Sequence, residues 1–228
     1  MASSFSTNAQ LELITTGEKA GQWSGITNTN LQILEQTSTG VLDVDISAGS
    51  STLVLTDGGT STGKNVYLRL HGTLAANRTV TMPVTAERVW IMKDDTVRGT
   101  SNYTVGVLTA SGTTQPIPPG ATVLCKSNGS ETVVSIIEKG YATITDANSP
   151  YTTVAGAQIL ANTTSTVITV TLPAAASTGD EVTIIDARGT WGSNNLTVGR
   201  NGLKINSGTS DLTLSNNGQS ITLVYVDS

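Results

Sequence analysis

From Val41 onward, the chain contains short runs in which apolar and β-branched residues alternate with polar ones. A period of two is typical of strands with one buried face, because successive side chains point to opposite faces of a sheet. Gly, Pro and Asn residues separate the runs and favour turns, since they tolerate positive φ or fix φ. The clearest predicted strands are residues 53–55, 65–70, 78–82, 88–92, 103–107 and 121–125. The helical period of 3.6 does not occur in this span, so the pattern predicts an all-β fold.

This span also contains an internal repeat. Residues 79–83 (TVTMP) recur 90 positions later as residues 169–173 (TVTLP), and an apolar run that ends in Asp follows each of them. The further matches, in the same order, are 89–94 with 182–186, 103–106 with 196–199, and 120–125 with 218–224. Self-similarity of this kind indicates repeated structural units. We therefore predict two tandem, related β-sandwich or barrel-like modules, at residues 41–140 and 141–228.

The first 40 residues have a different pattern. Thr27 is a suitable N-cap for a helix over residues 28–37, which would place Leu31 and Leu34 on one face. Residues 11–14 (LELI) are predicted to add a short strand. The segment is therefore expected to be partly helical and to precede the two modules.

This N-terminal segment carries apolar side chains that it is too short to enclose. Full burial of a Leu-sized side chain is worth about 1.5–3 kcal/mol, and a small helix needs a partner surface to obtain it. We therefore predict that residues 1–40 form an attachment segment. Its candidate contact residues are Leu11, Leu13, Trp23, Leu31 and Leu34.

Composition narrows the classes of function. Asp and Glu outnumber Lys and Arg by 17 to 12, so the basic footprint of a nucleic-acid-binding protein is not expected. No stretch approaches the roughly 20 apolar residues of a membrane-spanning helix, so membrane insertion is not expected either. The first residues lack a basic segment followed by an apolar block, and cytosolic synthesis is the expectation. A single cysteine, Cys125, leaves no intrachain disulfide and no Cys-rich zinc site.

One segment imitates a nucleotide-binding loop. Residues 58–65 (GGTSTGKN) match G-x-x-x-x-G-K, but Asn65 stands where Ser or Thr would bind Mg²⁺. An alternating run that is predicted to be a strand follows, so no helix N-terminus would face a phosphate. The pattern therefore favours a Gly- and Thr-rich hairpin.

The other reactive side chains lie in ordinary structural settings. His71 follows a predicted strand and precedes Gly72, which is typical of a turn histidine that donates to a backbone carbonyl. Cys125 lies in an apolar strand and is predicted to be a small buried hydrophobe.

Pairs of carboxylates are candidate catalytic groups, because glycoside hydrolases use them. The three candidate pairs are Asp94 with Asp95, Asp43 with Asp45, and Asp180 with Glu181. Asp94 and Asp95 are adjacent in a predicted strand, so their side chains point to opposite faces. Asp180 and Glu181 follow Gly179 in a predicted turn. Asp43 and Asp45 share a face, but one that is expected to be exposed to solvent. We therefore predict no catalytic residue, no metal site and no cofactor, and hence that the protein is not an enzyme.

Trp191 is the candidate for carbohydrate binding. It lies in a Gly-, Ser- and Asn-rich segment that is expected to be an exposed loop, where its ring could stack on a sugar. The favoured alternative is that Trp191 packs on its own module or on a neighbouring subunit.

Residues 11–23 (LELITTGEKAGQW) and the Asn-rich stretch 27–31 (TNTNL) resemble the N-terminal segment of β-rich virion proteins from tailed bacteriophages of the marine and cyanobacterial type. Residues 170–173 (VTLP), 179–186 (GDEVTIID) and 195–202 (NLTVGRNG) resemble units that are common in phage tail fibres. The resemblance covers nearly the whole chain and implies a trimeric appendage. Family members often continue past the last strand to a Trp, so the end at Ser228 leaves open whether another chain completes an edge strand.

The expected function is therefore that of a structural virion component: a tail fibre, a fibre adaptor or a head-attached fibre that contributes to assembly and host attachment. The alternatives are a carbohydrate-binding receptor-recognition module and, less favoured, a polysaccharide depolymerase. The expected location is the virion after synthesis in the host cytoplasm. The expected partners are further copies in a homotrimer, other virion proteins of the tail or capsid, and a host-surface glycan.

Overall fold

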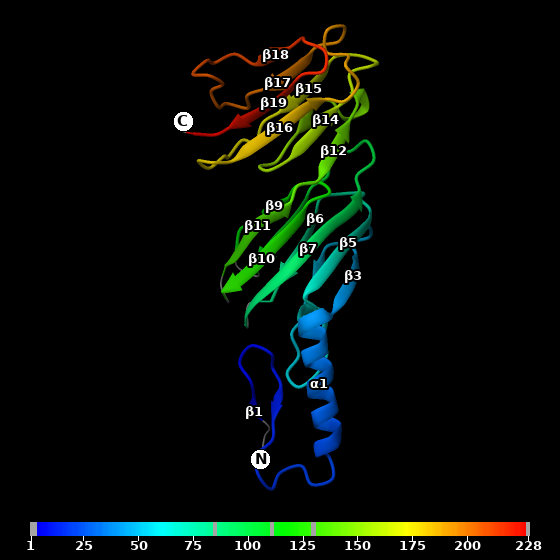
Figure 1. Cartoon of the computed structure of the whole chain (residues 1–228), viewed down its shortest axis with the longest axis vertical. Helices are drawn as coiled ribbons and strands as arrows, with labels where there is room; N and C mark the ends of the chain where they lie inside the picture. The colour runs from blue at the N-terminus through cyan, green and yellow to red at the C-terminus, as the bar shows by residue number, and fades with distance from the viewer. Residues whose placement is uncertain (1–3, 84–85, 110–111, 129–130, 227–228) are drawn as a thin grey trace.

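The computed structural model describes residues 4–83, 86–109, 112–128 and 131–226. The chain is elongated, with an N-terminal hairpin and helix at one end and two β-units stacked beyond them (Figure 1). The first described residues and the last strand lie toward opposite ends of the long axis (Figure 1). We refer to strands β3–β11 as the first β-unit and to strands β12–β19 as the second β-unit.

The first β-unit consists of two sheets. One sheet, in spatial order, contains β11 (Thr132–Glu138), β10 (Thr122–Asn128), β7 (Glu87–Val97), β5 (Tyr67–Thr73) and β3 (Val41–Asp45). The other contains β4 (Ser51–Thr52), β6 (Arg78–Met82), β8 (Val105–Thr109) and β9 (Gln115–Ile117). A 3₁₀ turn, η1 (Thr62–Lys64), lies between β4 and β5.

The second β-unit repeats this arrangement. One sheet contains β12 (Tyr141–Ile144), β14 (Gln158–Ala161), β16 (Glu181–Asp186) and β19 (Ser220–Val224). The other contains β13 (Tyr151–Thr152), β15 (Ile168–Thr171), β17 (Leu196–Gly199) and β18 (Leu212–Leu214). The 3₁₀ turn η2 (Asp146–Asn148) connects β12 to β13.

Each β-unit is a short β-solenoid, which corrects the expectation of β-sandwich or barrel-like modules. Through the three turns of each unit, β3–β8 and β12–β17, successive strands alternate between the two sheets. Strands of successive turns pair in parallel, as in β3 with β5 and β5 with β7. After three turns the chain reverses, and β10 and β19 pair antiparallel with the last turn. The period-two pattern identifies strands but carries no information on which strands become neighbours or in which direction, so it did not predict the solenoid.

The buried apolar side chains form two clusters. The first is formed by Val44, Ile46, Leu53, Leu68, Leu70, Leu74, Val80, Met82, Trp90, Met92, Val105, Val107, Ile117, Ala121, Val123 and Cys125. The second is formed by Ile144, Tyr151, Ala157, Ile159, Ala161, Ile168, Val170, Leu172, Val182, Ile184, Trp191, Leu196, Val198 and Leu214. The overall all-β prediction is confirmed, whereas the module boundaries at residues 40 and 140 stay a prediction.

The N-terminal segment contains a small antiparallel hairpin, β1 (Ser4–Phe5) with β2 (Glu12–Leu13), and one helix, α1 (Trp23–Thr39). The helix is longer than predicted and begins before Thr27, with Gln22 at the N-cap position and no side-chain cap bond. Thr27 therefore lies within the helix and is not its N-cap. In the described part of the chain, no helix has both the length and the apolar character needed to cross a membrane.

Candidate interaction surfaces

The helix α1 presents an apolar stripe to solvent. Trp23, Leu31 and Leu34 are 63%, 57% and 45% exposed. At about 100° per residue these three side chains fall within one quarter of the helix circumference. We call them the α1 stripe. The prediction that Leu31 and Leu34 share a face is consistent with this geometry, and the longer helix adds Trp23 to the same face.

A different side of α1 anchors the helix to the first β-unit. Ile33 is fully buried, and the side-chain amide oxygen of Gln36 accepts a hydrogen bond from the backbone N–H of Ser61 (3.3 Å). This contact uses another side of the helix than the α1 stripe, whose three side chains stay exposed.

The N-terminal hairpin is fastened to the same helix. The Asn30 side chain accepts a hydrogen bond from the backbone N–H of Glu12 (3.0 Å) and donates one to the Glu12 carbonyl (2.9 Å). The neighbouring Leu13 is exposed, whereas Leu11 is half-buried. Four of the five predicted attachment residues are therefore available to a partner, and Leu11 is available only in part.

A second apolar surface lies on the outer face of the five-stranded sheet. The strand register aligns Val41, Tyr67, Ile91 and Leu124 in one row across β3, β5, β7 and β10. The inward residues next to them, such as Leu68 and Met92, are buried, so the row faces outward. Val41 is exposed and the other three are half-buried. We call this row the outer band. Sequence reasoning missed it, because its members are far apart in the chain and only the sheet register brings them together.

Charged side chains occupy the next rows of the same face. Arg69 forms an ion pair with Asp43 (2.9 Å), and His71 lies between Asp45 and Asp95 in the strand register. His71 is therefore in strand β5 and not in a turn as predicted. Asp45 accepts a hydrogen bond from the backbone N–H of Ser47 (2.8 Å), and hydrogen bonding to Ser47 lowers the pKa of Asp45.

The segment that imitates a nucleotide-binding loop has a structural role. Lys64 is fully buried, and its ammonium donates to the carbonyls of Thr56 and Gly59, at 2.7 Å each. Burial lowers the pKa of Lys64, and the positive charge of Arg88 adds to this effect. The ammonium closes the loop on itself, and the predicted hairpin is replaced by the 3₁₀ turn η1. The lysine therefore does not point into an open phosphate site.

The Asp residues that end the repeated strands are structural as well. Asp94 is buried and accepts hydrogen bonds from Arg98 (2.6 Å) and the Thr96 hydroxyl (2.6 Å). Asp186 accepts backbone N–H groups of Arg188, Thr190, Trp191 and Gly218. Burial alone would raise the pKa of Asp186, but these backbone donors lower it overall. The carboxylates hold the loops that follow each strand.

Cys125 is buried in β10, and burial raises the pKa of its thiol to about 12, so it is not a thiolate near neutral pH. Among the residues that the structure describes, no three His, Cys, Asp or Glu side chains gather in a way that could hold a metal ion.

The expectation that Trp191 is an exposed sugar-stacking residue is wrong. Its side chain is fully buried in the second apolar cluster, because the 188–192 segment folds back over Asp186. The alternative, packing on its own module, is what the structure shows. The flanking Gly, Ser and Asn residues made a loop predictable, but they carried no information on the direction of the indole ring.

Comparison with known proteins gives little guidance. No family model and no curated protein matches the chain. Among solved structures, one match is described as "Structure of a chaperone-substrate complex", with 12% sequence identity and a TM-score of 0.37. The match covers 82% of this chain, and this chain spans only 30% of the matched one. The fold and the surfaces described above therefore define a tandem β-solenoid protein with an apolar N-terminal end.

Proposed function

We propose that the chain is a non-enzymatic structural component of a tailed-phage virion: a tail fibre, a fibre adaptor or a head-attached fibre. The observation that carries the proposal is the α1 stripe at one end of an elongated chain whose two β-units extend away from it (Figure 1). In this arrangement the N-terminal segment attaches to another virion protein and the β-units project outward.

The physical basis of attachment is the burial of the stripe. Each Leu-sized side chain gains about 1.5–3 kcal/mol when it is fully removed from water. Trp23, Leu31 and Leu34 are largely exposed, so most of that gain is still available to a partner surface. Helices with an apolar face of this kind commonly dock in grooves of a partner protein.

Self-association into a trimer is part of the proposal. The outer band gives the five-stranded sheet an apolar outward row that begins at Val41, directly after α1. Association that covers this row would remove its apolar side chains from water, which is the main favourable term in most protein association. The outer band is thus the candidate subunit interface, and the α1 stripe is the candidate attachment site.

The described residues give the two alternatives less support than the attachment role. A depolymerase would need converging acidic side chains, yet among the candidates Asp43 pairs with Arg69, and Asp94 holds the neighbouring loop through Arg98. A sugar-binding role was assigned to Trp191, whose buried ring cannot stack on a ligand. Host attachment would then use other surfaces of the assembled particle.

The experiment combines particle analysis with a surface variant. Mass spectrometry should detect the wild-type chain in purified particles of the phage that encodes it. The triple variant Trp23→Ser, Leu31→Ser, Leu34→Ser should be incorporated at least tenfold less, while its circular dichroism matches wild type. Exposed positions tolerate such changes because they hold few buried contacts.

A matched control removes exposed apolar side chains elsewhere. The double variant Val97→Ser, Val167→Ser changes residues that are about as exposed as Leu31, on strands or loops away from α1, and should be incorporated normally. Absence of the wild-type chain from purified particles would contradict the virion assignment. Normal incorporation of the triple variant would contradict the attachment site alone.

A further inference from the structure

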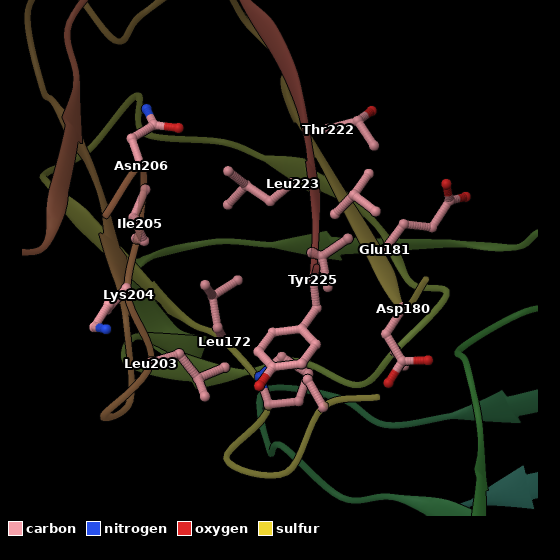
Figure 2. A pocket seen from close by; sticks show the side chains of 15 residues that line it. Leu172, Asp180, Glu181, Leu203, Lys204, Ile205, Asn206, Thr222, Leu223 and Tyr225 are labelled. Atoms are coloured by element: carbon pink, nitrogen blue, oxygen red, sulfur yellow. The ribbon is translucent and has the colours of Figure 1, made fainter. Parts of the chain in front are cut away.

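A pocket of about 310 Å³ lies beside β19 in the second β-unit. Leu172, Leu203, Ile205 and Leu223 face one another across it, and the ring of Tyr225 lies at one end (Figure 2). One wall is strand β19, and the opposite wall is the connection between β17 and β18 that contains Leu203 and Ile205. The pocket is therefore a space with apolar residues at its centre next to a sheet edge, and its lining also includes Asp180, Glu181, Lys204, Asn206 and Thr222.

The edge beside this pocket is open. Within the described residues, β19 pairs with β16 on one side and with no strand on the other. The Tyr225 N–H bonds to the Asp180 carbonyl (2.8 Å), and the Gln219 carbonyl bonds to the Asp186 N–H (2.9 Å). Because backbone direction alternates along a strand, the odd-numbered residues face β16. Thr222 and Val224 therefore direct their N–H and C=O groups to the open side.

The first β-unit has a strand in the equivalent position. Strand β10 corresponds to β19, since each pairs antiparallel with the strand of the third solenoid turn. On its second side β10 pairs with β11, which places Val134 opposite Cys125 and against the first apolar cluster. The Gln115 side chain then donates to the Thr132 carbonyl (2.7 Å) and accepts from the Val134 N–H (3.2 Å). The far edge of β11 is thus covered by an amide side chain.

The register shows where the corresponding side chain would lie in the second β-unit. Cys125 is opposite Trp90 in the first unit, and Leu223 is opposite Val182 in the second. A residue paired with Leu223 from the open side would therefore occupy the place that Val134 has in the first unit. That place is the pocket, whose apolar walls suit a β-branched side chain.

We propose that the groove along β19 accepts a β-strand donated by a partner protein. The strand would run antiparallel to β19, as β11 does with β10, and would carry apolar or β-branched side chains at alternate positions. Backbone groups of Thr222 and Val224 would supply affinity, and the pocket would supply specificity, which is the usual division in strand addition. In the first β-unit the equivalent position is filled by a single extended strand, β11, so a single strand is the occupant that we propose. The proposal does not depend on the virion assignment.

The probe is a fluorescently labelled peptide with the sequence of residues 131–138 (ETVVSIIE), titrated into the full-length chain and followed by anisotropy. We expect saturable binding. A peptide with Asp in place of Val134 should bind at least tenfold more weakly, because its carboxylate would enter the apolar pocket. A peptide with Asp in place of Val133 should bind within about threefold of the original, since that side chain faces away from the pocket.

The matching change in the protein is Val224→Pro. Proline removes only the N–H that faces the open side, and strands tolerate it where that group has no ladder partner. This variant should weaken peptide binding at least tenfold, whereas Val224→Thr, which keeps the N–H, should bind within about twofold of wild type. If Val224→Pro lowers the stability of the fold, Leu203→Asp provides a second variant, because it places a carboxylate on the opposite wall of the pocket.

Three outcomes would overturn the proposal. The first is no peptide binding at millimolar concentration. The second is binding that is unchanged by Val224→Pro and Leu203→Asp, or by the Val134 change in the peptide. The third is a wild-type oligomer that Val224→Pro converts to a monomer, which would show that a second copy of this chain occupies the edge.

Discussion

The two buried tryptophans offer a sharp test of the structure, because they occupy different hydrogen-bonding environments. The Trp90 indole N–H donates to the Gly63 carbonyl at 2.9 Å, and both Trp90 and Trp191 are fully buried. The Trp191 indole N–H is buried and has no hydrogen-bond partner among the described residues. Replacing each residue by Phe removes the N–H group and leaves a somewhat smaller ring in the same site.

The two replacements should therefore differ in cost. Both replacements remove apolar contacts at a fully buried site, so the hydrogen-bonding difference is what distinguishes them. Trp90→Phe also leaves the Gly63 carbonyl without its donor, which costs about 1–3 kcal/mol. Trp191→Phe instead removes an unpaired buried N–H, and so recovers about 1–3 kcal/mol of its desolvation penalty. We expect Trp90→Phe to be more destabilising than Trp191→Phe by at least about 2 kcal/mol.

The assay is urea unfolding of the full chain, followed by far-ultraviolet circular dichroism. Thermal unfolding gives a second readout, since about 1 kcal/mol shifts the melting temperature by about 4–8 °C for a unit of 60–100 residues. Trp23→Phe is the control and should change stability by less than about 0.5 kcal/mol, because Trp23 is exposed. Equal costs for Trp90→Phe and Trp191→Phe, or a larger cost for the latter, would refute the reasoning.

Three further predictions concern assembly, pH and the loop lysine. Light scattering at micromolar concentration should give three times the chain mass of 23.5 kDa, and a folded monomer would contradict the trimer. Burial raises the pKa of the Cys125 thiol from 9.0 to about 12 in the folded chain. As pH rises, the thiol therefore loses its proton first in the unfolded chain, which favours unfolding. Through this group the wild type should lose about 1.4 kcal/mol of stability between pH 8 and pH 10. In urea titrations at pH 8 and pH 10, Cys125→Ala should lack this loss of unfolding free energy. An equal loss in the variant and the wild type would contradict the role of Cys125. Lys64→Met should destabilise the chain by about 1–3 kcal/mol, because the Thr56 and Gly59 carbonyls lose their donor. Calorimetry should show no binding of MgATP to the wild type, and stoichiometric binding would contradict the structural role of Lys64.

The sequence by itself determined the features that depend on local pattern. The period of two gave most of the predicted strands, although the strand expected at residues 53–55 is absent and β4 lies just before it at Ser51–Thr52. The repeated 79–83 and 169–173 segments lie on the equivalent strands β6 and β15. The departure of Asn65 from the nucleotide-binding pattern and the apolar setting of Cys125 were also readable from neighbouring residues. These properties are local because they follow from side-chain alternation and from residue type.

Tertiary structure decided the features that depend on which strands become neighbours. Parallel pairing of successive turns made solenoids of strands whose sequence pattern fitted a sandwich equally well. Parallel pairing brought Val41, Tyr67 and Ile91 of the outer band into one row, and antiparallel pairing of β10 with β7 added Leu124. Within the described residues, β19 has one partner strand where β10 has two. Trp191 turned inward because Asp186 gathers the following backbone N–H groups around itself. Neighbouring strands and loop direction arise from contacts between distant residues, so they cannot be read from the period of a single strand.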